Sequence, residues 1–127
     1  MLLLVAGIID FGILFYNKQV LTNASREGAR AGIVYQVDAD GDKIIVTEGE
    51  IQTIVQNYCD NKRLWTFGGS SLPVTTATGV ESLNYPADLT VTVSFTYTYL
   101  LSSIFNIFGV DLGPSLDISA VTVMRME

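Results

Sequence analysis

The first 35 residues change from uniformly apolar to amphipathic without a break in helical spacing. Met1–Tyr16 is apolar on every side except for one acid, Asp10, and such a helix has to be buried in lipid or in protein. Residues 17–35 continue the helix with one apolar and one polar face. A helix of this length would reach about 50 Å, which is longer than a domain of this size is wide. We therefore expect one end of it to project and to be covered by a bilayer, by sister copies, or by each in turn.

Small residues recur every four positions on the apolar face of the second half of this helix. They are Ala24, Gly28 and Gly32, and their spacing lets another backbone approach closely. One interpretation is packing on the protein's own sheet, and the other is close helix–helix packing between subunits. Both can hold at different heights along the helix.

A second helix is predicted for Thr47–Lys62, after a turn-rich segment and a short strand candidate at Ile44–Val46. Thr47 and Glu50 have the spacing of a capping box, in which each side chain binds a backbone amide of the first turn. The apolar face of this helix consists of Ile51, Ile54, Val55 and Tyr58. Cys59 is interpreted as a small apolar residue of the same helix, with an intersubunit disulfide as the alternative.

Three later segments predict an antiparallel sheet. Leu89–Tyr99 alternates strictly between apolar and polar residues, which is typical of a strand with one buried face. Leu116–Met126 alternates in the same way, and the weaker strand Leu72–Thr76 contains Pro73, which favours an edge position. The apolar side of the last strand would comprise Leu116, Ile118, Ala120, Met124 and Met126.

Between the two long strands, Leu100–Phe108 has helix-like apolar spacing but is too short to span a membrane. It should either cap an open end of the sheet or present an apolar patch to a neighbour. The predicted fold is therefore α+β, with a long protruding N-terminal helix packed on a small antiparallel sheet and a short second helix beside it. Residues 1–35 would form the helix, and residues 36–127 the globular head.

The composition of the chain limits the range of possible functions. The chain of 127 residues has a net charge of −6, one cysteine and no histidine. An acidic protein lacks the clustered Lys and Arg that a nucleic acid requires, and without histidine or a second cysteine the usual zinc sites and Ser-His-Asp or Cys-His catalysis are excluded. We expect no enzyme, no cofactor, no small-molecule substrate and no nucleic-acid partner.

The turn before the predicted second helix contains three alternating aspartates. Asp38, Asp40 and Asp42 have the D-x-D-x-D spacing that opens calcium-binding loops. Lys43 stands where such a loop needs glycine, and Gly49 stands where it needs a bidentate glutamate. The favoured interpretation is a solvated acidic turn without a metal, and the alternative is a calcium-binding adhesion module.

The segment Gly7–Ile33 reads GIIDFGILFYNKQVLTNASREGARAGI. It resembles the G-I-x-E-F-G…Q-x-L-T-N-A-x-R-E-G-A-R signature of the TadE-like family of tight-adherence (Flp) pilus systems, which is similar to type IV pilins and pseudopilins. Asp88–Leu101 and Leu116–Glu127 give a weaker second match, whereas Val34–Ala87 shows no specific similarity. Asp10 replaces the family's usual glutamate and keeps its charge. Family members carry a further apolar stretch behind a prepilin-type leader, so either an upstream part is missing here or processing occurs at another place.

The resemblance implies a structural subunit of an extracellular type IV pilus-like filament. Such a subunit is held in the cytoplasmic membrane by its helix, and is then extracted by pilus assembly machinery and packed with identical copies at the cell surface. The helices form an apolar filament core, so that surface leaving lipid is buried again between sister helices, and an interface that does not close yields a helical polymer. The alternative is a minor TadE-like pseudopilin or another membrane-anchored component of the assembly or secretion machine.

Asp10 is the strongest single site candidate, because a carboxylate in an apolar helix is costly unless it is paired or protonated. We expect it to pair with a donor of an adjacent subunit, such as the amine of Met1 or of Lys18, with a protonated or hydrated carboxyl as the alternative. Asp10→Ala is then expected to reduce assembly while the β domain stays folded. The full set of expected subunit contacts is Met1, Leu2, Leu3, Leu4, Val5, Ile8, Ile9, Asp10, Phe11, Ile13, Leu14, Phe15 and Tyr16.

Overall fold

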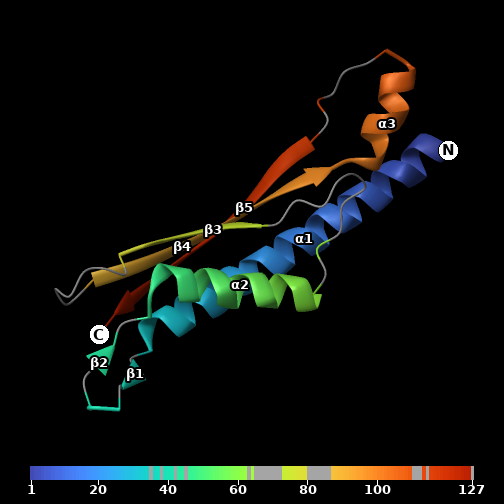
Figure 1. Cartoon of the computed structure of the whole chain (residues 1–127). Helices are drawn as coiled ribbons and strands as arrows, with labels where there is room; N and C mark the ends of the chain where they lie inside the picture. The colour runs from blue at the N-terminus through green and yellow to red at the C-terminus, as the bar shows by residue number, and fades with distance from the viewer. Residues whose placement is uncertain are drawn as a thin grey trace.

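The computed structural model describes residues 1–34, 36–37, 39–41, 43–44, 46–62, 64, 73–79, 87–109, 113 and 115–126. Its elements follow in the order α1 (Leu2–Ile33), β1 (Gln36–Val37), β2 (Lys43–Ile44), α2 (Glu48–Lys62), β3 (Val74–Thr78), β4 (Ala87–Thr98), α3 (Leu100–Ile107) and β5 (Ser115–Met126). Figure 1 shows an elongated molecule with the two termini at opposite ends. The α+β fold with a long N-terminal helix on a small antiparallel sheet is confirmed.

The main sheet has the strand order β3-β4-β5, and both pairs are antiparallel. β4 is the central strand, and its alternation places one set of side chains in the core. β3 lies at an edge, as the proline before it predicts. The buried side chains of β4 are Leu89, Val91, Val93, Phe95 and Tyr97, which confirms the period of two in the sequence.

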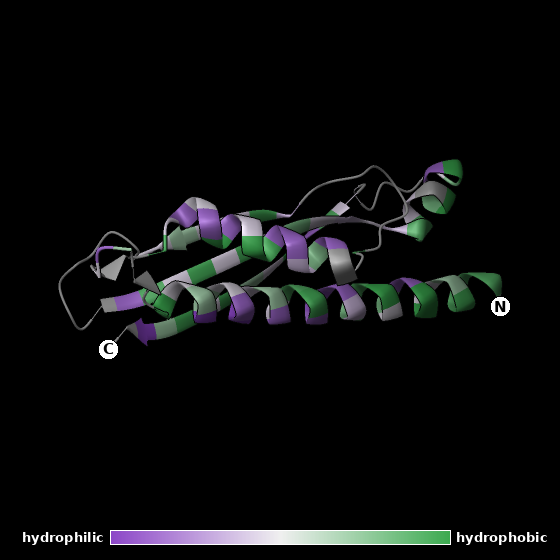
Figure 2. Cartoon of the chain, turned by 60° about the horizontal axis from the view of Figure 1, so that its bottom comes forward, coloured by the Kyte–Doolittle hydropathy of each residue, from purple (hydrophilic) through white to green (hydrophobic). Residues whose placement is uncertain are grey.

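Two helices cover one face of this sheet. α1 packs along β4 and β5, while α2 lies beside α1 and reaches β3 (Figure 1). Polar groups of α1 also bind β5: the Ser25 hydroxyl lies 2.6 Å from the Thr122 hydroxyl, and the Lys18 ammonium donates to the Ser119 carbonyl. Figure 2 shows that the hydrophilic positions of α1 become frequent only away from the N-terminus.

The small residues of α1 lie where α1 meets α2 and β4. Ala24, Gly28 and Gly32 are all buried. A Cβ atom added to Gly28 would lie 2.6 Å from Val55 Cγ2, and one added to Gly32 would lie 2.5 Å from Leu89 Cδ2. The stripe therefore contacts the protein's own helix and sheet, which is the first of the two interpretations given above.

The capping box at the start of α2 is present. The Thr47 amide donates to Glu50 Oε2 at 2.8 Å, and the Glu50 amide donates to Thr47 Oγ1 at 3.4 Å. Each side chain thus satisfies a backbone donor at the helix end, where no donor has a partner within the helix. Ile51 and Val55 are buried, and Ile54 and Tyr58 are half-buried.

Cys59 is a free thiol with 2% of its surface exposed. Its burial favours the small apolar role, because a disulfide to a sister subunit would require α2 to leave the core. Burial, and to a lesser degree the nearby charge of Asp60, raise the pKa of the Cys59 thiol to about 11.

A pH titration tests this thiol. The unfolded thiol ionises near its ordinary pKa of 9.0, so folding favours the neutral form and the stabilisation is complete below pH 9. It is lost as the pH rises from 9 to 11, by about 2 kcal/mol. We expect urea unfolding of the wild type to lose this stability relative to Cys59→Ala over that range. Equal pH dependence in the two proteins would contradict the prediction.

Several predicted boundaries, and the predicted burial of Leu116, differ from the structure. α1 ends at Ile33, because Val34 is extended with φ −85° and ψ 121°, whereas the sequence predicts helix to residue 35. Leu116 was predicted to face the core and is exposed. The second strand is Lys43–Ile44 rather than Ile44–Val46, although Val46 is buried.

Candidate functional site

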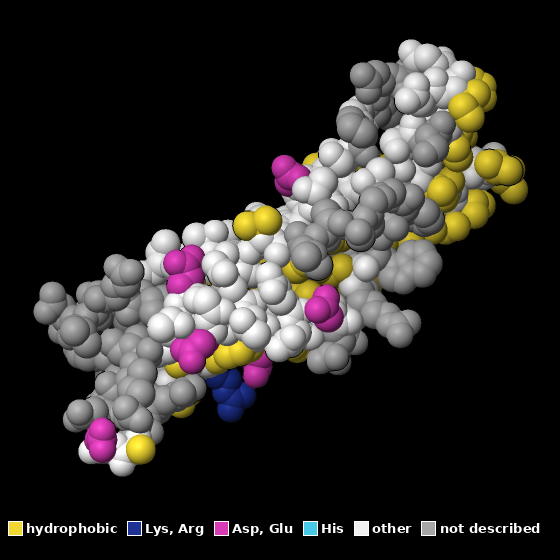
Figure 3. Space-filling model, viewed as in Figure 1, with side chains coloured by type: hydrophobic (Ala, Val, Ile, Leu, Met, Phe, Trp, Pro, Cys, Tyr) yellow, Lys and Arg dark blue, Asp and Glu magenta, His cyan; other side chains and the backbone are white. Residues whose placement is uncertain are grey.

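The N-terminal end of α1 carries an exposed apolar surface, which we call the apolar end. Figure 3 shows hydrophobic side chains gathered at the end of the molecule where the N-terminus lies. At 100° per residue, the exposed side chains from Ile8 onwards fall within about half of the helix circumference. The exposed members are Met1, Leu2, Leu3, Leu4, Val5, Ile8, Ile9, Phe11, Phe15 and Tyr16.

Three residues expected at the subunit surface face the protein instead. Ile13 and Leu14 are partly buried and pack against the core. Asp10 is 5% exposed. The chain itself therefore covers one side of the apolar half of α1, and the opposite side is exposed.

Asp10 is bound by three donors from its own chain. Asp10 Oδ1 accepts from the Tyr97 hydroxyl at 2.9 Å and from the Leu100 amide at 2.9 Å. Asp10 Oδ2 accepts from the Leu101 amide at 3.0 Å. These donors belong to the chain itself, whereas the expected donors were those of an adjacent subunit, and the Lys18 ammonium of the same chain binds Ser119. The carboxyl group therefore obtains its partners by folding.

These contacts make Asp10 the N-terminal cap of α3. The residue at the N-cap position, Tyr99, makes no side-chain cap hydrogen bond, and the first amides of any helix have no partner within it. Asp10 supplies that partner from α1, a helix distant in sequence. The partial positive charge at the start of α3 also favours a negative group there. The arrangement explains how a carboxyl group is accommodated among apolar side chains.

Tyr97 contributes the third donor and is fully buried at the end of β4. A buried tyrosine hydroxyl requires a hydrogen-bond partner, and Asp10 provides it. Burial, followed by this hydrogen bond, raises the pKa of Tyr97. The sequence analysis missed Tyr97 as a partner, although a tyrosine in the buried register of a strand was a usable signal.

α3 itself adds to the apolar end. Ile107 and Phe108 are 82% and 73% exposed, and the first turn of α3 contacts α1, where Leu101 Cδ1 lies 3.9 Å from a Cβ added to Gly7. Of the two alternatives expected for this segment, these exposed side chains favour the apolar patch.

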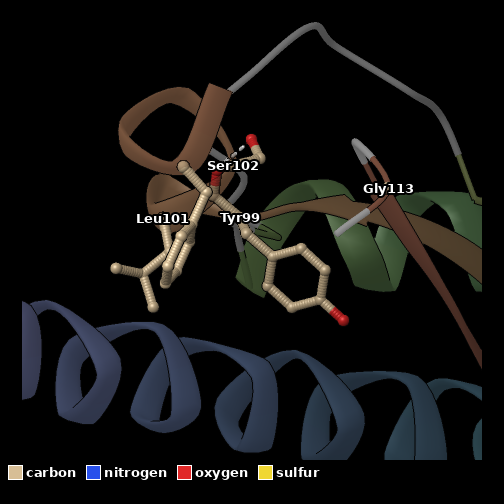
Figure 4. Close-up of a pocket in the computed structure, with 5 residues that line it drawn as sticks. Tyr99, Leu101, Ser102 and Gly113 are labelled. Atoms are coloured by element: carbon tan, nitrogen blue, oxygen red, sulfur yellow. Dashed lines mark hydrogen bonds between the residues drawn. The ribbon is translucent and has the colours of Figure 1, made fainter. Parts of the chain in front are cut away.

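A pocket of about 240 Å³ lies between α3 and the region of Gly113. It is lined by Tyr99, Leu101, Ser102, Phe105 and Gly113. Figure 4 shows Tyr99 and Leu101 directed toward α1, and Ser102 turned back to donate to the Tyr99 carbonyl at 2.7 Å. Its described lining residues are mostly apolar and include no charged group, so this part of the pocket supports contact with apolar groups.

The acidic turn lies partly outside the described residues. Asp38 and Asp42 are not among them, and Asp40 is exposed. Within the part of the chain that the structure describes, no group of three or more acidic, cysteine or histidine side chains is placed to hold a metal ion.

By length and composition, α1 qualifies as a helix that could cross a membrane. A signal sequence, or the core helix of a soluble protein, would pass the same test. Only 22% of its most apolar stretch is buried within the protein, so most of that stretch faces outward rather than into a core.

Comparison with known proteins gives a match to a protein family. No curated protein and no solved structure matches the chain. The model of one protein family, described as TadE-like protein, matches residues 1–30. That range contains the apolar end of α1, Asp10 and the small residue Gly28, and it lies almost entirely within α1. Residues 1–30 thus carry the TadE-like signature that the sequence resemblance indicated.

Proposed function

We propose that this protein is a membrane-anchored subunit of a tight-adherence-type pilus and that it polymerises with identical copies through the apolar end of α1. The observation that carries the proposal is the exposed apolar end within the TadE-like match. Apolar surface of this extent on a soluble monomer marks an interaction or membrane site.

The state of Asp10 supports the same function. Because three donors of its own chain bind this carboxyl and only 5% of Asp10 is exposed, the apolar end presents little of this polar group to a bilayer before assembly. The same helix can then pack against sister helices at the cell surface. In this proposal the protein acts as a building block and catalyses no reaction.

A matched pair of substitutions tests the anchor. Ile8 on α1 and Val121 on β5 are β-branched and similarly exposed, at 65% and 59%. A charge in the apolar layer costs about 3 kcal/mol, and each 1.4 kcal/mol is about a tenfold change, so Ile8→Asp is expected to lower partition of the full chain into phosphatidylcholine vesicles about a hundredfold. Val121→Asp is expected to partition like the wild type. Equal partition of the two variants would overturn the anchoring role.

Filament formation is tested separately. Surface material sheared from cells that assemble the pilus is expected to contain long uniform fibres in negative stain that include this chain, and Ile8→Asp is expected to abolish its incorporation while Val121→Asp retains it. Recovery of the chain only in the membrane fraction, with fibres that lack it, would instead indicate the minor pseudopilin or assembly-machine role.

A further inference from the structure

We propose that α3 is a second membrane contact and lies in the interface of the bilayer beside the point where α1 enters it. This inference rests on the proposed function, because it assumes that the apolar end of α1 is in lipid. It adds a second element, distant in sequence, that the TadE-like match does not include.

The first argument is chemical. Tyr97–Val110 contains no Asp, Glu, Lys or Arg, and Met1–Tyr16 contains only Asp10, which accepts three hydrogen bonds from its own chain. Ile107 and Phe108 are largely exposed on α3. These two segments, which meet at one end of the molecule, thus carry no charged side chain other than the hydrogen-bonded Asp10, and a bilayer favours such a surface.

The second argument is the level at which α3 starts. Its first two amides bind Asp10, so α3 begins beside the tenth residue of the chain. The start of α3 therefore lies beside α1 within the stretch Met1–Tyr16, and it meets lipid wherever this part of α1 does.

The third argument is direction and length. Figures 1 and 2 show α3 leading away from α1 rather than lying along it. With eight residues, α3 cannot span the apolar layer. A short uncharged helix that diverges from a membrane-entering helix is placed to lie in the interface with its apolar side chains among the acyl chains.

Polar contacts begin farther along α1, and on β4, on the side of Asp10 away from the N-terminus. The Lys18 ammonium binds the β5 backbone, and Thr96 donates to Asp117 at 2.7 Å. Tyr16 is exposed, and the Tyr97 and Tyr99 rings pack edge to face with centroids 5.6 Å apart. Tyrosines near the change from apolar to polar surface are typical of a membrane interface.

The test places one environment-sensitive NBD label on the full chain in phosphatidylcholine vesicles. Cys59→Ala removes the native thiol, and a single new thiol is introduced by Phe108→Cys, Leu4→Cys or Val121→Cys. All three positions are exposed, so labelling should leave the core intact. Bromines placed on the acyl chains near the headgroup or near the methyl end then report depth by quenching.

The expected result is a blue-shifted emission at positions 4 and 108, with the label at 108 quenched most by bromines near the headgroup and the label at 4 by deeper ones. The label at 121 should remain unquenched. Quenching at 4 without quenching at 108 would overturn the role of α3 and leave the anchor standing. No quenching at either position would overturn the proposed anchor itself.

The same labels distinguish contact of α3 with a sister copy from contact with lipid. If α3 contacts a sister copy, the label at 108 would be blue-shifted but unquenched by brominated lipid, and the shift would increase with the protein-to-lipid ratio. That result would overturn the bilayer as the partner of α3.

Discussion

Asp10→Ala is expected to lower the free energy of unfolding of the full chain in detergent by about 3 kcal/mol, because it removes the acceptor of three hydrogen bonds at once. The Tyr97 hydroxyl is fully buried and would lose its partner, and the amides of Leu100 and Leu101 would lose their cap. For a chain of this size the loss corresponds to a fall in melting temperature of about 10 °C. Urea unfolding followed by circular dichroism measures the change.

Two matched variants show whether the loss comes from the cap. Phe11→Ala shortens the exposed neighbour of Asp10 and should leave stability nearly unchanged. Tyr97→Phe removes one of the three donors and should cost about 1 kcal/mol. Hydrogen exchange at the amides of Leu100 and Leu101 should accelerate in Asp10→Ala and remain slow in Phe11→Ala. If these amides stay protected in Asp10→Ala, Asp10 is not the cap of α3.

This prediction changes how an assembly defect at Asp10 should be interpreted. The sequence alone led us to expect that Asp10→Ala would spare the β domain, but Asp10 contacts Tyr97 at the end of β4 and the start of α3. Reduced filament yield from this variant would therefore combine a damaged fold with any lost contact between subunits. Tyr97→Phe separates the two, since it weakens the internal cap and keeps the carboxyl group.

The elements that sequence periodicity predicted best are those whose burial is one-sided. β4 lies at the centre of the sheet with one face under the helices, so every second residue is forced inward and the alternation is strict. α2 has a local signal at its start, because Thr47 and Glu50 bind each other's backbone amides within one turn. Both signals act between residues close in sequence.

The features that sequence missed depend on contacts between distant residues. Asp10 lies about 90 positions from its partners in the sequence, and no local pattern marks that pairing. β5 is an edge strand, and Leu116 near its start is exposed although it shares the register of the buried Ile118 and Ala120. The apolar character of Leu116 predicted burial, but a residue near the end of an edge strand has fewer neighbours to cover its side chain.

The small residues of α1 were the point on which two interpretations remained open, and Gly28→Leu distinguishes them. In the structure, a Cβ atom at Gly28 would meet Val55 Cγ2 at 2.6 Å, Ile51 Cγ2 at 3.3 Å and Val91 Cγ1 at 3.5 Å. A leucine there would require α1 to separate from α2 and β4. Valine in a helix has one strongly preferred side-chain rotamer, so Val55 cannot rotate freely to make room.

We expect Gly28→Leu to cost about 3 kcal/mol, the upper part of the range for overpacked cores, measured by urea unfolding of the full chain in detergent. Gly12→Leu is the matched control in the same helix, because a Cβ at Gly12 has no neighbour within 4 Å. There the better helix propensity of leucine should leave stability unchanged or raise it by about 0.5 kcal/mol.

A compensating substitution shows that the cost arises from the internal contact. Adding Val55→Ala to Gly28→Leu removes the nearest methyl group and should recover part of the lost stability, whereas Val55→Ala alone destabilises by leaving a cavity. If the stripe instead packed chiefly between subunits, Gly28→Leu would leave the single chain as stable as Gly12→Leu and would block only assembly. If Gly28→Leu leaves the unfolding free energy unchanged but abolishes fibres, the small residues of α1 pack between copies rather than within the subunit.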